Sequence, residues 1–183
     1  MPYKKDINRV VSLEEALLYI DVLDRPRDKA LVALLHLTGA RPTEIREVRK
    51  EHITVEENQV KILMMTAKLK GVPGFFLRER ILVFKRDAPG VEHFLDWYSV
   101  CPTPDLFRGT HGKPISTTRI RQLVYKASGN AICPYHFRHS RLTKLARSGW
   151  GADQLMYWKG SRTVRSVSVY IASKPVTAPD KLD

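Results

Sequence analysis

Apolar residues recur at helical spacing in two stretches near the start of the chain. Residues 13–23 place leucine, alanine and isoleucine three or four positions apart, directly after a Ser-x-x-Glu capping box at 12–15. This pattern predicts a first helix over about 13–23. A second helix is predicted to begin at Pro26, because proline suits a first helical turn. Its apolar run over 30–37 ends before Gly39, where a left-handed helix cap favours glycine.

The period of the pattern changes in the middle of the chain. Pro42 opens a short third helix, and then residues 53–55, 59–65 and 80–84 are rich in β-branched and apolar side chains. These three runs predict three strands. The segment 66–79 between the last two holds two lysines, one arginine and two glycines, so we expect a long basic hairpin tip there.

Helical spacing returns after a Pro-Gly pair at 89–90, with further helices predicted from residue 91 and over 117–127, 135–147 and 153–158. The predicted fold is therefore mainly α with a small three-stranded antiparallel β-sheet (α+β). We expect one domain over 1–173 and a mobile C-terminal tail over 174–183, which is marked by two prolines.

Composition narrows the class of protein. Apolar residues make up 43% and charged residues 27%, which excludes a chain disordered throughout. No apolar run approaches the roughly 18 residues of a membrane span, and the start of the chain lacks the apolar stretch of a signal peptide. We therefore expect a cytoplasmic protein. Cys101 and Cys133 are too few for a disulfide framework and are expected to be structural thiols.

Charge adds a candidate partner. The chain has 31 Lys and Arg against 19 Asp and Glu, a formal net charge of +12. So strong a charge on a short chain indicates an acidic partner, either nucleic acid or an anionic membrane surface. The basic residues are spread over the whole chain and form no single amphipathic lysine-rich helix, so nucleic acid is favoured over the membrane. A basic enzyme with a solvated charged face is the alternative.

Three segments hold residues suited to phosphate chemistry. In segment 38–45, TGARPTEI, a glycine turn presents Arg41 just ahead of a helix N-terminus, a place where guanidinium and backbone donors can hold a phosphate. Segment 134–140, PYHFRHS, packs one tyrosine, two histidines and Arg138 into the start of a helix. Segment 160–172 holds Tyr170. Each segment alone also fits an ordinary capped helix or a packing tyrosine.

In this order the three segments resemble the motifs of the tyrosine recombinase (phage integrase) family. The family's first motif, T-G-x-R-x-x-E-[LI], is matched throughout by 38–45. The second, H-x-x-R-H-[TS], is matched in its last three positions by 138–140. The third, G-[HW]-x(8)-Y, is matched in spacing by Gly160 and Tyr170. The resemblance covers about 12–173 and implies the catalytic-domain fold of that family.

Two positions depart from these motifs. Tyr135 stands where the family has the leading histidine of the second motif, and Ser161 where it has histidine or tryptophan after the glycine. Trp158, Lys159 or His136 could substitute in space. Such departures resemble the divergent archaeal and viral branches of the family. The family's N-terminal core-binding domain has no counterpart here, so we expect an excised catalytic domain or a naturally short member.

The resemblance implies site-specific cleavage and rejoining of double-stranded DNA through a 3′-phosphotyrosyl intermediate, with no metal and no cofactor. Tyr170 would be the nucleophile. Arg41 and Arg138 would neutralise the non-bridging phosphate oxygens. The leaving 5′-oxygen needs a proton, for which Lys68 is the first candidate and Lys70 the second. All four basic residues are expected to contact DNA.

Supporting roles follow from the same resemblance. Glu44 would orient an arginine, Tyr135 or His136 would assist deprotonation of the nucleophile, and His139 would hold the helix geometry. His136 and Lys159 are further candidates for the general acid.

Oligomerisation on DNA into a synaptic tetramer, from a monomer in solution, and association with the nucleoid are also expected. The resemblance leaves two alternatives open: a non-catalytic DNA-binding regulator, and a type IB topoisomerase-like activity.

Overall fold

The computed structural model describes residues 8–66, 79–109 and 112–172. The elements are, in chain order, α1 (Leu13–Asp21), α2 (Pro26–Thr38), α3 (Pro42–Ile45), the 3-10 helix η1 (Lys50–His52), β1 (Ile53–Val55), β2 (Gln59–Met65), β3 (Glu79–Lys85), α4 (Val91–Val100), α5 (Thr117–Ala127), α6 (Pro134–Arg147), α7 (Ala152–Lys159) and α8 (Arg165–Ala172).

Local signals set the ends of the first two helices. At α1 the capping box forms in both directions: Glu15 N donates to Ser12 Oγ at 3.1 Å, and Ser12 N donates to Glu15 Oε2 at 3.0 Å. The helix ends at Asp21, two residues before the end expected from the pattern. Helix α2 ends as predicted, with Gly39 in the left-handed region at φ 60°.

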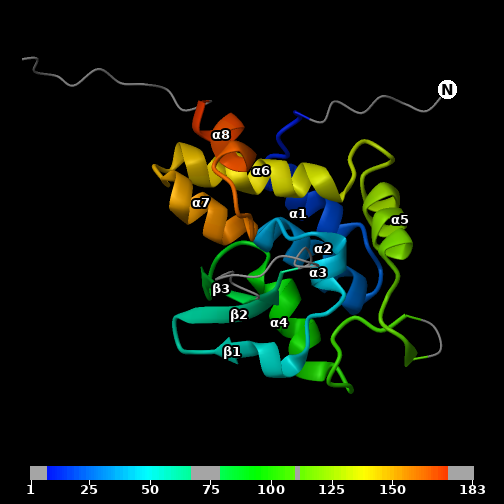
Figure 1. Ribbon diagram of the computed structural model, residues 1–183. Helices are drawn as coiled ribbons and strands as arrows, with labels where there is room; N and C mark the ends of the chain where they lie inside the picture. The colour runs from blue at the N-terminus through cyan, green and yellow to red at the C-terminus, as the bar shows by residue number, and fades with distance from the viewer. Residues whose placement is uncertain (1–7, 67–78, 110–111, 173–183) are drawn as a thin grey trace, which may run out of the picture.

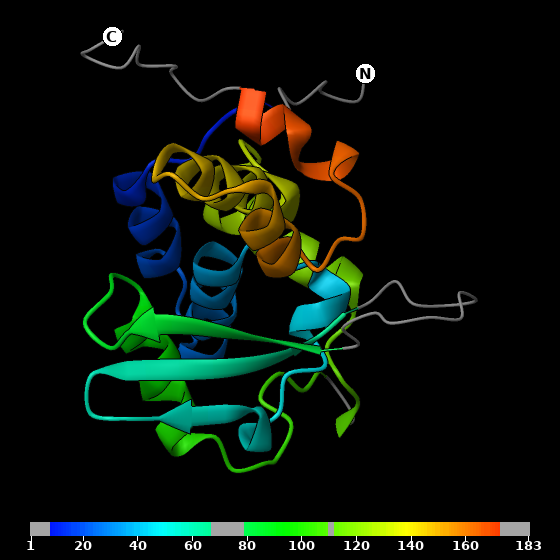
Figure 2. The same ribbon diagram turned by 60° about the vertical axis from the view of Figure 1, so that its left-hand side comes forward.

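Helix α2 is the centre of the core. Residues 30–38 are buried on all sides of the helix, because its apolar residues do not keep to one stripe. The helix packs against α1 and α4 and also against α6. Figures 1 and 2 show the sheet at one end of the molecule and α8 at the other, with α6 and α7 between them.

The strands form one antiparallel sheet in the order β1-β2-β3. Alternate residues of β2 and β3 face inwards, and the inward set on β3 is Arg80, Leu82 and Phe84. Leu82 pairs with Ile62 of β2, which is also buried. The sequence-based prediction of a mainly helical fold with a three-stranded antiparallel sheet is confirmed.

Other predictions need correction or lie outside the described ranges. Helix α8 was not predicted, because serine and valine alternate over 166–169 and give no helical spacing there, and Val169 is 60% exposed. The third helix is shorter than its pattern and ends at Ile45. Most of the basic hairpin tip, 67–78, lies outside the described residues, and so does the tail.

Cys101 and Cys133 are free thiols. No helix in the described part of the chain is long and apolar enough to cross a membrane.

Because α2 holds a buried histidine, we expect the free energy of unfolding to fall in mild acid. Burial, with smaller contributions from the charges of Lys144 and Arg141, lowers the pKa of His36 to about 3. Because this folded-state pKa lies below the unfolded value of 6.5, the stabilisation is complete above pH 6.5 and is lost as pH falls. At pH 5 the loss is about 2 kcal/mol (1.5 pKa units at 1.36 kcal/mol each). Urea unfolding at pH 7 and pH 5 measures it.

The variant His36→Leu provides the control for this prediction. It cannot take up a proton at this position, so its free energy of unfolding should fall less than the wild type's between pH 7 and pH 5. Equal losses in the two proteins would show that His36 does not carry the acid sensitivity.

Candidate active site

A glycine turn brings Arg41 up to helix α6. A Cβ on Gly39 would lie 3.0 Å from Arg141 Cβ and 3.2 Å from Arg138 Cα, and the residue has a positive φ. Only glycine therefore fits without moving the turn or the helix. Arg138 Nη1 donates to the carbonyl oxygen of Gly39 at 2.8 Å, which ties the turn to α6. Arg41 follows as the N-cap residue of α3.

Glu44 holds Arg41 in place from inside the fold. The carboxylate is buried, and Arg41 donates to it twice, from its backbone N to Oε2 at 2.9 Å and from Nη1 to Oε1 at 2.9 Å. Burial alone would raise the pKa of Glu44, but Arg80, the Arg41 backbone N–H, Arg138 and the Arg41 charge together lower it below its usual value. The carboxylate is therefore ionised at neutral pH.

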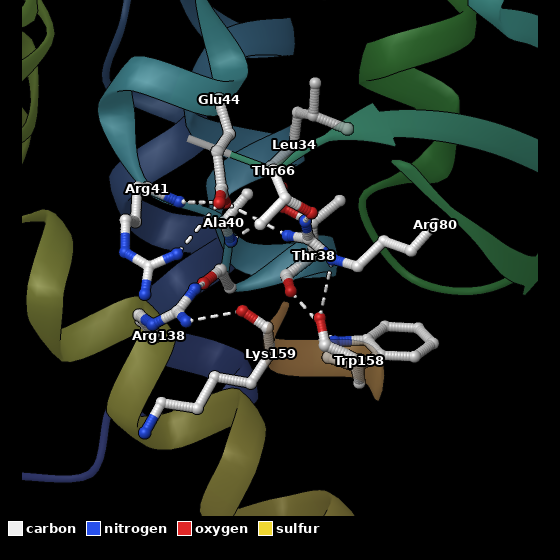
Figure 3. Close-up of polar contacts among 11 residues, drawn as sticks. Leu34, Thr38, Ala40, Arg41, Glu44, Thr66, Arg80, Arg138, Trp158 and Lys159 are labelled. Atoms are coloured by element: carbon white, nitrogen blue, oxygen red, sulfur yellow. Dashed lines mark hydrogen bonds and ion pairs between the residues drawn. The ribbon is translucent and has the colours of Figure 1, made fainter. Parts of the chain in front are cut away.

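Arg138 reaches the same place from α6. It is only 6% exposed, and its Nη2 donates to the carbonyl oxygen of Lys159 at 2.7 Å. Burial first, and then the charge of Arg41, lower its pKa to about 10, so it remains charged at neutral pH. The guanidinium groups of Arg41 and Arg138 lie side by side in Figure 3.

Both arginines line one cavity of about 540 Å³. Its other charged and aromatic lining residues are Arg121, Tyr125, Tyr135 and Lys159. The cavity joins α3, α5, α6 and the end of α7, which are far apart in the sequence. Its chemistry suits a phosphodiester, because two fixed guanidinium groups can contact the oxygens on which negative charge accumulates.

Tyr170 of α8 lies near Arg138 and is only 3% exposed. Its ring centroid is 5.5 Å from that of His139 and 5.3 Å from Lys159 Nζ. Burial first, and then the charge of Tyr135 and a side-chain hydrogen bond with it, raise the pKa of Tyr170, whereas Arg138 lowers it. The hydroxyl is therefore protonated in the free protein, and a base must accept its proton before it can attack a phosphate.

Lys159 links the cavity to α8. Its Nζ donates to the carbonyl oxygen of Ser166, near the start of that helix. Burial, Arg138 and Arg41, in that order, lower the pKa of Lys159 to about 8. Ser161, which stands where the family motif has histidine or tryptophan, bonds through its hydroxyl to that of Ser166. Ser161 therefore contacts α8, and its hydroxyl helps hold the start of that helix.

Two of the three residues proposed to substitute for the missing motif side chains face the core. His136 is fully buried, and its Nδ1 accepts a hydrogen bond from Cys133 N at 3.0 Å, at the first turn of α6. Trp158 is buried too, and its Nε1 donates to the carbonyl oxygen of Thr38 at 2.9 Å. Of the three candidates, Lys159 is thus the one that lines the cavity.

His139 lies between two tyrosine rings, stacked on Tyr135 at 6.3 Å between ring centroids and tilted against Tyr170. Tyr135 itself is 47% exposed at the cavity. The structure thus brings Tyr135, His139 and the expected nucleophile together. Lys68 and Lys70, the two candidates for the general acid, lie outside the described residues.

The sequence model of the phage integrase family matches residues 7–176. The chain belongs to this family. It is 26% identical over 161 residues to tyrosine recombinase XerD of Bifidobacterium longum, covering 82% of this chain and 51% of that protein. It is 25% identical to XerD of Staphylococcus haemolyticus over 187 residues, covering 92% and 59%. The chain therefore spans about half the length of these relatives.

Solved structures of recombinases have a similar fold. The XerH site-specific recombinase bound to its difH substrate gives a TM-score of 0.69 at 19% identity, covering 87% of this chain and 48% of that one. XerA recombinase gives 0.68 at 20% identity, covering 93% and 60%. The expected fold family is confirmed. Membership of an archaeal or viral branch stays a prediction.

Sequence reasoning on this integrase-family chain missed three side chains near the arginines. Arg121 and Tyr125 of α5 line the cavity, but neither lies in a family motif. Arg80 is buried and contacts Glu44. The signal for Arg80 was its place in the strand pattern, because it shares the inward-facing parity of Leu82 and Phe84.

Proposed function

We propose that this chain carries the catalytic machinery of a site-specific DNA recombinase or integrase, which cleaves and rejoins DNA strands through a 3′-phosphotyrosyl intermediate. The observation that carries the proposal is that Arg41 and Arg138 line one cavity, and that Tyr170 lies close enough to Arg138 for their charges to interact. Family membership supports it, as do relatives described as tyrosine recombinases and a structural neighbour bound to its DNA substrate.

In the proposed reaction the Tyr170 hydroxyl attacks the scissile phosphorus. The O–P bond to tyrosine forms, the bond to the 5′-oxygen breaks, and the reverse steps rejoin a strand, so the energy of the phosphodiester is conserved. Arg41 and Arg138 stabilise the charge on the non-bridging oxygens. Their donors are fixed in advance by Glu44 and by the carbonyls of Gly39 and Lys159, so little reorganisation is needed.

Two proton transfers complete the proposed mechanism. Lys159, whose pKa of about 8 lies near neutrality, can accept the tyrosine proton in its neutral amine form, and Tyr135, which is hydrogen-bonded to Tyr170, can relay it. The 5′-oxygen leaves with a proton from a lysine, for which Lys68 remains the first candidate and Lys70 the second.

Double-stranded DNA is the proposed partner, consistent with the net charge of +12. Helix α5 contributes Arg121 to the cavity and Arg119 to a second basic hollow with Arg25 and Arg27. We propose that DNA runs along this helix. The same proposal includes three further points: residues 1–173 act as one catalytic unit, the chain assembles into a tetramer on DNA, and it associates with the nucleoid.

Affinity for duplex DNA is expected to fall steeply with salt. Each phosphate neutralised by a lysine or arginine contributes about −0.9 to the slope of log affinity against log salt concentration. Replacing the exposed Arg121 by alanine should make that slope shallower by about one unit. Fluorescence anisotropy with a labelled duplex at four salt concentrations measures both. Arg49→Ala is the matched control, because that arginine is paired with Glu51 and Asp105. An affinity insensitive to salt would contradict the electrostatic account.

The general acid is tested with a 5′-bridging sulfur at the scissile phosphate. A thiol has a pKa near 8.5, several units below that of an alcohol, so a sulfur leaving group needs no acid. Lys68→Ala should be slow on ordinary DNA and recover on sulfur DNA, whereas Arg138→Ala should be slow on both. If sulfur rescues Lys70→Ala instead, the assignment moves to Lys70. If it rescues neither lysine variant, the acid lies elsewhere, and Lys159, which lines the cavity, becomes the candidate.

The proposed function itself is tested by trapping the covalent intermediate. The 183-residue chain is incubated with a pool of nicked duplexes of randomised central sequence, and DNA-linked protein is isolated in SDS and mapped by mass spectrometry. The proposal expects the link at Tyr170. Binding without any adduct would favour a non-catalytic regulator. Relaxation of a supercoiled plasmid without strand exchange would favour a topoisomerase-like activity.

A further inference from the structure

Arg80 is a buried arginine outside all three motifs, and each of its nitrogens has a partner. Its side chain is 1% exposed at the start of β3. Nε donates to the carbonyl oxygen of Trp158 at 2.9 Å, Nη1 to Thr66 Oγ1 at 3.2 Å and Nη2 to Glu44 Oε2 at 3.0 Å. Figure 3 shows these contacts around one guanidinium, on the opposite side of the Glu44 carboxylate from Arg41.

Two of the three partners, Glu44 and Trp158, belong to the segments that support the cavity arginines. Glu44 binds Arg41 through its other oxygen. Trp158 precedes Lys159, whose carbonyl oxygen accepts a hydrogen bond from Arg138. Thr66 follows the end of β2, so Arg80 also ties the two strands together at this end of the sheet. One guanidinium thus connects β2 and β3 with α3 and the end of α7.

The fold leaves space for this guanidinium. Gly160 follows directly after α7, and a Cβ there would lie 2.7 Å from Arg80 Nη1 and 3.3 Å from Thr66 Cγ2. Gly160 also has a φ of 61°. The glycine that the family motif requires is therefore needed here by the packing of Arg80 as well as by the turn into α8.

The charge of Arg80 matters most for Glu44. That carboxylate has no exposed side-chain surface, and the charges that face it are Arg80 from β3, Arg41 from its own helix start and Arg138 from α6. Removing one partner of a buried pair leaves a desolvated charge that tends to take up a proton. A neutral Glu44 would lose its charge-assisted hold on Arg41.

We propose that Arg80 is a positioning residue for the strand-transfer reaction, which keeps Glu44 ionised and aligned on Arg41 and holds the end of α7 beneath Arg138. The inference rests on the proposed function. Arg80 is too buried to contact DNA, so it acts through Glu44 and through the carbonyl of Trp158. The competing explanation is that Arg80 only contributes to the stability of the sheet.

The experiment compares the pH dependence of adduct formation in wild type and in Arg80→Met, with the nicked pool described above. Full burial can raise the pKa of a carboxyl group by about 3 to 5 units. We therefore expect the ratio of the variant rate to the wild-type rate to fall about ten-fold from pH 8 to pH 6, as Glu44 takes up a proton. The double variant Arg80→Met/Glu44→Gln should show no such fall, because glutamine does not titrate.

Two further variants separate positioning from stability. Asp28→Asn breaks another ion pair of a buried carboxylate, the one with Arg27, at a place away from the cavity. It should lower the melting temperature without a new pH dependence. Arg80→Lys keeps the charge, so its rate should partly recover with a pH profile parallel to wild type. It also serves as the test if Arg80→Met does not fold, and an acidic fall in Arg80→Lys would then overturn the inference.

A second readout follows Glu44 without any DNA. In protein labelled with ¹³C at glutamate carboxyl carbons, the Glu44 resonance, assigned with Glu44→Gln, should titrate at a higher pH in Arg80→Met than in wild type. Unchanged titration, or a variant rate that stays in constant ratio to wild type from pH 8 to pH 6, overturns the inference. If wild type forms no adduct at all, the proposed function fails and the inference fails with it. The carboxyl titration then shows separately whether Arg80 controls Glu44.

Discussion

Tyr170→Phe is expected to abolish the covalent DNA adduct while leaving DNA binding intact. The substitution removes only the hydroxyl, and the ring that packs against His139 and Lys159 remains, so the fold and the charged surface are kept. With the nucleophile absent, the rate of adduct formation should fall by about 10⁴-fold or more. Gel analysis after SDS treatment measures the adduct, and anisotropy measures binding.

Tyr98→Phe is the matched control for this experiment. Tyr98 lies on α4, stacks on Phe94 and has no part in the cavity. Its variant should form adduct at the wild-type rate. An adduct in Tyr170→Phe would mean that another residue is the nucleophile and that the match of the third motif is misplaced.

Arg138→Ala is expected to slow cleavage by about 10² to 10³-fold, the loss typical of one preorganised oxyanion donor. The same change leaves the carbonyls of Gly39 and Lys159 without this donor, which should reduce the free energy of unfolding by about 1 to 3 kcal/mol. Single-turnover rates are therefore compared well below the melting temperature of the variant.

Two controls separate the chemical loss from the structural one. Arg138→Lys keeps the positive charge but lacks the planar guanidinium with its paired N–H donors, so it should recover only part of the cleavage rate. Arg147→Ala removes an exposed arginine in the last turn of the same helix and should cleave normally. A near-normal rate in Arg138→Ala would remove this arginine from the catalytic site.

Local chemistry in the sequence was enough to predict most of the elements. The capping box before α1 and the left-handed glycine after α2 act between neighbouring residues, so their outcome does not depend on the rest of the fold. The β-branched and apolar runs at β2 and β3 were enough to indicate strands. The order of three short motifs was enough to indicate the family, and with it the pairing of Arg41 with Arg138. Helix α8 was not predicted because its packing against α6 and α7, rather than the spacing of its own apolar residues, stabilises it.

Only the tertiary structure decided which of several polar side chains reach the cavity. His136 and Lys159 were equal candidates by sequence, but the turn of α6 directs His136 into the core, and the end of α7 brings Lys159 beside Tyr170. Arg80 lies 36 residues from Glu44 along the chain, and no motif links the two. Burial and ion pairing between distant segments depend on how the elements pack. The sequence by itself thus determined most of the elements, the family and the chemical groups, and the packing determined the partners of these groups.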